Sequence, residues 1–153
     1  MNIFISYSSK NLSLVNQISK LVGALADFKY WDKDKEYGEH DWSTIRGWID
    51  KCDLVLVILT SDSKDNRHVG VEIGYAQSKQ KNLMAFVSDQ VPKTELGSLS
   101  GTTYVTFDEK NPEFSHTEMF RAISARKIKK AKDEGNLLLA IALIVGVVLV
   151  SKK

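Results

Sequence analysis

The stretch LVLVIL, Leu54–Leu59, is a run of six apolar residues with polar residues on both sides. A strand that is half exposed alternates apolar and polar residues, whereas an unbroken apolar run is typical of a strand buried on both faces. Strands of this kind occur mainly in parallel sheets whose two faces are covered by helices. The run therefore predicts the central strand of an α/β domain.

Segments with strand-like and helix-like patterns alternate on both sides of this central strand. We expect four further strands, at residues 2–7, 28–31, 83–87 and 102–107. Apolar residues with helical spacing lie between these strands and after the last one, at residues 11–27, 42–51, 67–80 and 113–130. This alternation predicts a parallel sheet with helices on both faces. Five strands in so short a segment favour the flavodoxin-like order 2-1-3-4-5, in which ligands bind outside the carboxyl ends of the strands.

The composition is that of one ordinary globular domain and excludes several classes of protein. The chain has 153 residues, with 21 basic and 19 acidic side chains and a net charge of +2. This balance argues against a nucleic-acid-binding protein. The single cysteine, Cys52, leaves no intrachain disulfide and no cysteine zinc site. His40, His68 and His116 have no metal-ligand spacing, so we predict no metal site.

The charges are unevenly distributed, and the C-terminal end is strongly apolar. Residues 1–116 carry 13 basic and 16 acidic side chains, residues 117–134 carry 6 and 3, and residues 135–151 carry none. Leu137–Val150 is an unbroken apolar run of 14 residues, which is about 21 Å of helix. The uncharged run is at the lower limit for crossing a bilayer core of about 30 Å.

This pattern predicts a C-terminal membrane anchor. We divide the chain into a head at residues 1–126, a basic neck at 127–134 and a transmembrane helix at 135–153, with lysines on both flanks. A strand predicted directly after Met1 leaves no signal peptide, so we expect a single-pass protein with a cytoplasmic head. A buried core helix or an oligomerisation helix is the alternative.

Glu72 is the most interesting carboxylate of the head. At about 100° per residue it falls about 60° from Val69, beside the buried stripe that Val69 forms with Ile73 and Ala76. A partly desolvated carboxylate has a raised pKa and can act as a nucleophile or a general base. A solvated pair with His68, one turn earlier, is the simpler interpretation.

Hydroxyl and indole side chains form two further groups of candidates. Ser6, Tyr7, Ser8 and Ser9 follow the first predicted strand, where hydroxyls and a helix N-terminus could hold phosphate. Simple helix capping explains the serines as well. The tryptophans that flank the charged loop at residues 32–41 could stack on a flat ring or belong to the core; they are Trp31 and Trp42.

Three segments together resemble a known family. They are FISYSSK (4–10), YWDKDKEYGEHDWSTIRGWIDKCDLVLVILTSDS (30–63) and NRHVGVEIGYAQSKQK (66–81). They resemble three parts of Toll/interleukin-1 receptor (TIR) domains: the first strand, the region from the second strand to the third, and the helix that carries the family's glutamate. That helix has the E-I-G-Y-A form common in prokaryotic members. The likeness covers about residues 1–126, in the family's order and spacing.

The resemblance implies roles for particular residues. The family's catalytic glutamate corresponds to Glu72, and the residues that touch the substrate in catalytic relatives correspond to Ser8 and Ser9. The BB loop, which rearranges on assembly, corresponds to residues 32–41, from Asp32 to Asp41. The family often has a tryptophan where this chain has a histidine. The full set of candidate substrate-binding residues is Ser6, Tyr7, Ser8, Ser9, Trp31, Asp32, Trp42 and His68.

The resemblance also implies a function. Many prokaryotic TIR domains are NAD glycohydrolases or cyclases that break the nicotinamide–ribose bond, in antiviral defence or signalling, when assembled through the BB loop. We therefore expect NAD+ as the substrate, no cofactor or metal, self-association, and lipid contact through residues 135–153. Two alternatives stay open: a non-catalytic TIR adaptor that acts by homotypic assembly, and an enzyme similar to nucleoside deoxyribosyltransferases, which share the sheet and a comparable glutamate.

Overall fold

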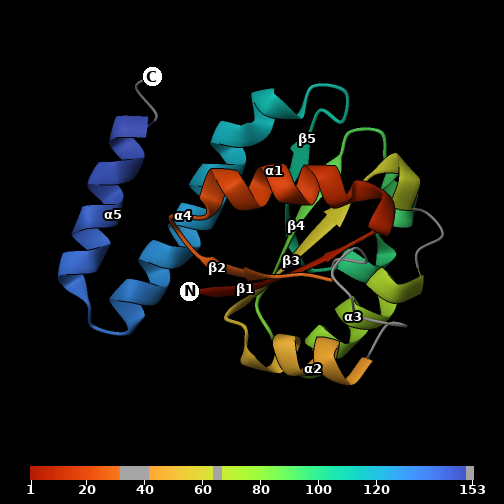
Figure 1. Cartoon of the computed structure of the whole chain (residues 1–153), viewed down its shortest axis with the longest axis horizontal. Coiled ribbons are helices and arrows are strands. Elements are labelled where there is room, and N and C mark those ends of the chain that lie inside the picture. The colour runs from red at the N-terminus through yellow and green to blue at the C-terminus, as the bar shows by residue number, and fades with distance from the viewer. Residues whose placement is uncertain (32–41, 64–66, 151–153) are drawn as a thin grey trace.

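The computed structural model describes residues 1–31, 42–63 and 67–150, which contain one five-stranded sheet (Figure 1). All neighbouring strands are parallel, in the order β2-β1-β3-β4-β5. The strands are β1 (Asn2–Tyr7), β2 (Asp27–Lys29), β3 (Leu54–Leu59), β4 (Leu83–Ser88) and β5 (Thr103–Phe107). The predicted flavodoxin-like order and parallel pairing are confirmed.

Helices cover both faces of the sheet (Figure 1). One face carries α1 (Leu12–Val22) and α4 (His116–Asp133), and the other carries α2 (Trp42–Lys51) and α3 (Arg67–Ser78). Residues 93–95 and 97–99, within a segment without clear periodicity, form two short 3-10 turns. The loop at residues 32–41, including the predicted role of Asp32, lies outside the described residues.

The central strand β3 separates two apolar cores. Leu54, Leu56 and Ile58 point into the core beneath α1 and α4, whereas Val55 and Val57 point into the core beneath α2 and α3. Successive side chains of a strand point to opposite faces, and here both faces are covered. All five side chains are at most 2% exposed, which confirms the interpretation of the apolar run as a doubly buried strand.

The C-terminal apolar run forms a helix that packs beside α4. Helix α5 spans Leu137–Val150, and Figure 1 shows it folded back along α4. The turn between them needs Gly135, whose φ of 72° is in the left-handed region, and Asn136, whose side chain accepts a hydrogen bond from the Leu139 amide. Ala140 is fully buried, and Leu143 packs against the core of the head.

The predicted transmembrane helix at 135–153 is not confirmed. In the part of the chain that the structure describes, no helix is both long and apolar enough to cross a membrane. The physical reason is the turn at Gly135, which separates α5 from α4 and leaves 14 helical residues, about 21 Å. Of the residues predicted as a neck, 127–134, residues 127–133 form the last turns of α4. Lys130 binds Asp53, the residue before β3 (2.7 Å).

Candidate functional site

Glu72 lies on α3 and is 5% exposed. Val69, Ile73 and Ala76 hold this helix against the sheet, since all three are buried in the core shared with α2. Glu72 stands beside that stripe, as its helical position predicts. Its carboxylate is therefore removed from bulk water, and the simpler interpretation of a solvated pair with His68 is wrong for Glu72.

Ser6 reaches Glu72 from the end of β1. Its hydroxyl donates a hydrogen bond of 2.5 Å to Oε2 of the carboxylate, and Ser6 is itself fully buried. Burial raises the pKa of Glu72 to about 7, and the Ser6 hydrogen bond, which favours the ionised form, lowers it in part. A glutamate with this pKa is present in both protonation states near neutral pH. Its ionised form is the one that a general base or a nucleophile requires.

A small pocket opens beside this carboxylate, between α2 and α3. Its volume is about 200 Å³, and its lining residues are Trp42, Ile45, His68, Val71 and Glu72. The structure thus brings together three residues singled out from the sequence, namely Glu72, Trp42 and His68. The Trp42 ring is partly buried and packs edge-on against Tyr75, with ring centroids 5.7 Å apart. Because the Trp42 ring lines the pocket, it can contact a planar ring of a bound ligand.

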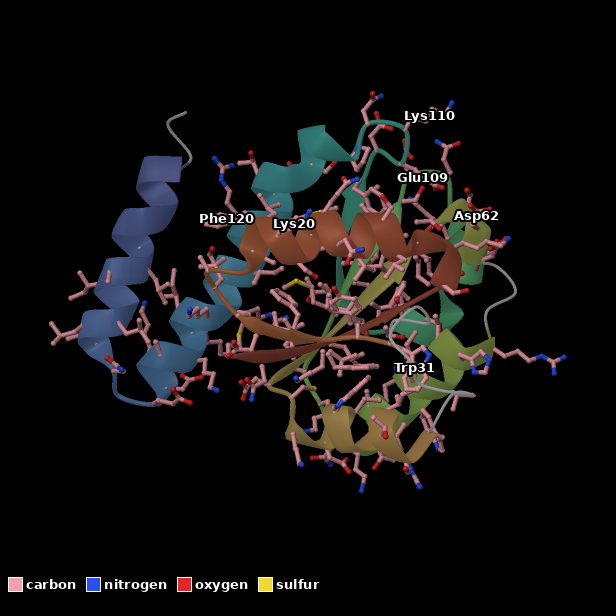
Figure 2. The ribbon with its side chains drawn as sticks, viewed as in Figure 1. Lys20, Trp31, Asp62, Glu109, Lys110 and Phe120 are labelled. Atoms are coloured by element: carbon pink, nitrogen blue, oxygen red, sulfur yellow. The ribbon has the colours of Figure 1, made fainter. Side chains whose placement is uncertain are left out.

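The other candidate side chains that the structure describes lie outside this pocket lining. Trp31 is 8% exposed and packs against Trp48, with ring centroids 6.1 Å apart, on the α2 side of the sheet (Figure 2). The Tyr7 hydroxyl donates a hydrogen bond to the carbonyl of Trp31. Trp31 is thus a core residue, and Tyr7 holds the end of β2 beside β1.

Ser8 and Ser9 begin the turn that follows β1. Ser8 is 4% exposed, and its carbonyl accepts a hydrogen bond from the Asn11 amide (2.8 Å), whereas Ser9 is exposed. Ser8 occupies the N-cap of the short 3-10 helix Ser9–Asn11, but its side chain makes no capping hydrogen bond. Helix capping therefore does not explain Ser8, and its proposed contact with substrate stays a prediction.

A second carboxylate, Glu109, lies at the same edge of the sheet and was not singled out from the sequence (Figure 2). It follows β5 and accepts hydrogen bonds from the Ser61 amide (3.0 Å), the Ser61 hydroxyl (2.7 Å) and the Ser88 hydroxyl (2.5 Å). Burial opposes ionisation, but the donated hydrogen bonds outweigh it and hold the pKa of Glu109 below its usual value. Glu109 thus connects the carboxyl ends of β3, β4 and β5.

A neighbouring pair connects this edge to the β1 turn. The side chains of Asn11 and Thr60 are both buried and form two hydrogen bonds, of 2.8 and 3.1 Å. Polar residues directly after the buried strands are the pattern from which the sequence could have predicted these hydrogen-bonded groups. Among the described residues, no group of three or more histidine, cysteine, aspartate or glutamate side chains could hold a metal ion.

Comparison with known proteins agrees with this architecture. A family profile described as the TIR domain matches residues 3–123, which is most of the chain. The chain belongs to the TIR domain family. No curated protein matches this TIR protein over its sequence.

A solved structure shares the fold. The CMP N-glycosidase BcmB of Clostridium botulinum is 11% identical, with a TM-score of 0.55, and the match covers 78% of this chain and 99% of that one. At this identity, the likeness shows a common fold and no more.

Proposed function

We propose that this TIR protein cleaves the nicotinamide–ribose bond of NAD+, with Glu72 as the catalytic carboxylate. The observation that carries the proposal is the buried Glu72 side chain, with a pKa of about 7, at the wall of a pocket near the carboxyl end of β1. Ligands of this sheet type bind at that edge. Within the described residues, no cation pairs with the buried Glu72 carboxylate. Burying such a charge is costly for stability, which favours a chemical role over a structural one.

The proposed reaction needs one carboxylate. The bond between C1′ of the ribose and the nicotinamide nitrogen breaks, and its electron pair neutralises the departing pyridinium ring. The ribose acquires oxocarbenium character, which an ionised carboxylate stabilises or captures covalently, before water adds to C1′ and loses a proton. The positive ring of NAD+ favours the ionised form of Glu72, so substrate binding itself prepares the group.

The pocket wall offers a surface for the nicotinamide ring. His68 stands where the family often has a tryptophan, but Trp42, on the facing helix α2, lines the same pocket. We assign ring contact to Trp42, with His68 beside it. Ser8 and Ser9, in the turn after β1, are assigned to the phosphate and ribose portion. Asp32 belongs to the same proposed set through its position in the loop.

The shared fold lends this proposal general support. The solved relative is described as a CMP N-glycosidase, so this fold carries glycosidase chemistry on a nucleotide in that protein. The E-I-G-Y-A segment resembles that of NAD-cleaving TIR domains, and this resemblance implies that Glu72 corresponds to their catalytic glutamate. NAD+ is the specific substrate proposed here, without a cofactor, in prokaryotic defence or signalling.

Assembly and membrane attachment complete the proposal. We expect TIR–TIR contacts through residues 32–41 to activate the site. Leu137, Leu138 and Ile141 are each at least 50% exposed on α5, and an exposed apolar surface of this kind favours contact with lipid. Membrane attachment through this surface would hold the heads on the cytoplasmic face and raise their effective concentration.

The test uses the full chain at a series of protein concentrations, with and without lipid vesicles. NAD+, CMP and a deoxynucleoside with a free acceptor base are supplied separately, and products are separated by chromatography. The proposal expects nicotinamide release from NAD+ that rises more than linearly with protein concentration and is absent in Glu72→Gln. Nucleoside exchange without NAD+ loss would favour the deoxyribosyltransferase alternative. Concentration-dependent assembly without turnover of any of the three would favour the adaptor.

A further inference from the structure

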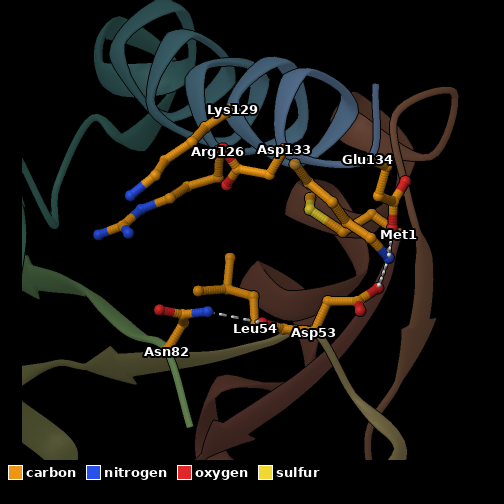
Figure 3. A pocket seen from close by; sticks show the side chains of 9 residues that line it. Met1, Asp53, Leu54, Asn82, Arg126, Lys129, Asp133 and Glu134 are labelled. Carbon is orange, nitrogen blue, oxygen red and sulfur yellow. Dashed lines mark hydrogen bonds and ion pairs between the residues drawn. The ribbon is translucent and has the colours of Figure 1, made fainter. Parts of the chain in front are cut away.

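A second cavity lies at the opposite edge of the sheet from Glu72. It has a volume of about 320 Å³ and lies between the last turns of α4 and the residues that begin β3 and β4 (Figure 3). Asp53 and Leu54 contribute from the start of β3, and Asn82 from the residue before β4. Because the strands are parallel, this amino edge is separated from the candidate active site by the length of the sheet.

At one end of the cavity, Lys130 is paired with two carboxylates. The Lys130 ammonium lies 2.7 Å from Asp53 Oδ2 and 3.4 Å from Glu134 Oε1. The Asp53 carboxylate also accepts a hydrogen bond from the Asn2 amide (2.8 Å). Burial works against ionisation of Asp53, but the bond from Lys130 outweighs it and lowers its pKa, and the same bond raises the pKa of Lys130. This end is already occupied by its own ion pairs.

The other end carries two cations that this network does not reach. Figure 3 shows the heads of Arg126 and Lys129 ending side by side, away from Asp53 and Glu134. Within residues 1–31, 42–63 and 67–150, neither head has an ion pair or hydrogen bond, and the same holds for the Asp133 carboxylate, one turn after Lys129. The three groups together leave one positive charge. Two neighbouring cations without a shared anion repel each other, which an anionic ligand would relieve.

The rest of the wall suits a small phosphate ester. The Asn82 amide lies across the cavity from the two cations, and its nitrogen donates a long hydrogen bond of 3.5 Å to the Asp53 carbonyl (Figure 3). The second N–H of this amide can donate to a ligand. Leu54 supplies an apolar wall for the organic part of a ligand. The forked donors of a guanidinium match two phosphate oxygens, and a lysine adds a point charge.

We propose that this cavity is a binding site for a phosphate monoester, held by Arg126, Lys129 and Asn82. This proposal does not depend on the proposed chemistry at Glu72. Two sources have the same chemistry: a soluble phosphate ester, and the headgroup of an anionic lipid, which the neighbouring apolar helix α5 would bring close. The experiment has one arm for each source.

The full chain is titrated with glycerol 3-phosphate and followed by backbone and side-chain amide NMR. In the second arm, it is sedimented with phosphatidylcholine vesicles that contain or lack phosphatidic acid. The variants are Arg126→Gln, Lys129→Gln and Arg126→Lys. Lys132→Gln is the matched control, since it removes one positive charge from the same helix outside the cavity lining. Urea unfolding verifies that each variant is folded.

The proposal expects saturable binding in at least one arm, with shifts at the Asn82 side chain. Binding should weaken about tenfold or more in Arg126→Gln and Lys129→Gln, less in Arg126→Lys, and little in Lys132→Gln. Binding only to vesicles assigns the site to a lipid headgroup, and binding to glycerol 3-phosphate alone assigns it to a soluble ester. No saturable binding in either arm, or equal weakening in Lys132→Gln, would overturn the site.

Discussion

Glu72 and Glu109 both lie where the strands of the sheet end, but their surroundings set them apart. Glu72 is 5% exposed and, within the described residues, accepts one hydrogen bond, from Ser6. Glu109 is partly exposed and receives three, from Ser61 and Ser88. The pKa of Glu72 is raised to about 7 by burial, whereas the hydrogen bonds outweigh burial at Glu109 and lower its pKa.

The difference teaches how one fold assigns two roles to the same side chain. Three donors satisfy most of the acceptor capacity of a carboxylate and fix it as an ionised structural group. A single donor in a desolvated pocket leaves the group costly to ionise and open to a ligand. We therefore propose Glu72, and not Glu109, as the catalytic carboxylate, and infer that Glu109 has a structural role.

The largest expected effect is on turnover. Glu72→Gln keeps the shape of the side chain and removes its charge, so NAD+ cleavage should fall about a thousandfold or more. Glu109→Gln removes the same charge from the same edge and should stay within about tenfold of the unmodified protein. Chromatographic assay of released nicotinamide at pH 8 measures both. Similar losses in the two variants would remove the distinction between them.

Stability should change in opposite directions in the same two variants. The folded-state pKa of Glu72, about 7, exceeds its unfolded value of 4.5, so the folded chain holds a proton that the unfolded chain has lost. This cost to stability grows as pH rises from about 4.5 to 7 and reaches roughly 3 kcal/mol above that range. Glu72→Gln should therefore be more stable than the unmodified protein at pH 8, and most of the gain should vanish by pH 4.5.

Glu109 has the opposite sign, because its folded pKa lies below the unfolded value. Its ionised form stabilises the fold above the unfolded pKa, and this contribution is lost as pH falls through the folded pKa. Glu109→Gln should lower the free energy of unfolding at pH 8. Urea unfolding of both variants at pH 4.5 and 8 is the measurement, and a loss of stability in Glu72→Gln at pH 8 would contradict the buried, costly carboxylate.

An intermediate effect is expected from the serine partners. Ser6→Ala removes the donor that favours the ionised form of Glu72, so the pKa of Glu72 should rise further. The pH profile of kcat/KM, which should rise with pH through about 7, should then move to higher pH, with activity partly regained in alkali. Ser88→Ala disturbs the Glu109 cluster and should leave the midpoint of the profile in place. A profile that does not move in Ser6→Ala would exclude this hydrogen bond from the control of ionisation.

The smallest effect is expected at the pocket wall. Trp42→Ala should raise KM for NAD+ roughly two- to tenfold with a smaller change in kcat, since ring contacts contribute about 0.5–1.5 kcal/mol. Trp48→Phe, on the same helix but packed in the core against Trp31, is the control and should leave KM unchanged. Steady-state kinetics separates the two parameters. An unchanged KM in Trp42→Ala would remove Trp42 from the substrate site.

Local pattern predicted the sheet and the place of Glu72, because both depend on residues close in the sequence. The apolar run of β3 and the helical position of Glu72 beside Val69 and Ile73 needed no tertiary information. The nearly complete burial of Glu72 did require tertiary information, because it depends on α2 and on Ser6, which is 66 residues away. The Glu109 cluster was missed for the same reason, because its donors, Ser61 after β3 and Ser88 at the end of β4, are distant in the sequence.

The C-terminal run shows a different limit of sequence reasoning. Apolar composition indicated a hydrophobic helix correctly, and Leu137–Val150 is one. Composition could not show that Gly135 would turn that helix back along α4, nor that Ala140 and Leu143 would pack against the rest of the molecule. The turn depends on the φ angle of one residue and on tertiary packing, so the hydropathy of the sequence does not predict it.

The most direct test of the account is a titration of the glutamate side-chain carboxyls by carbon-13 NMR in the full chain without substrate. The account predicts one resonance with a midpoint near pH 7 that is missing in Glu72→Gln, and another with a midpoint below 4.5 that is missing in Glu109→Gln. A Glu72 resonance that titrates at or below 4.5 would contradict the raised pKa, and with it the assignment of the chemistry to this buried carboxylate.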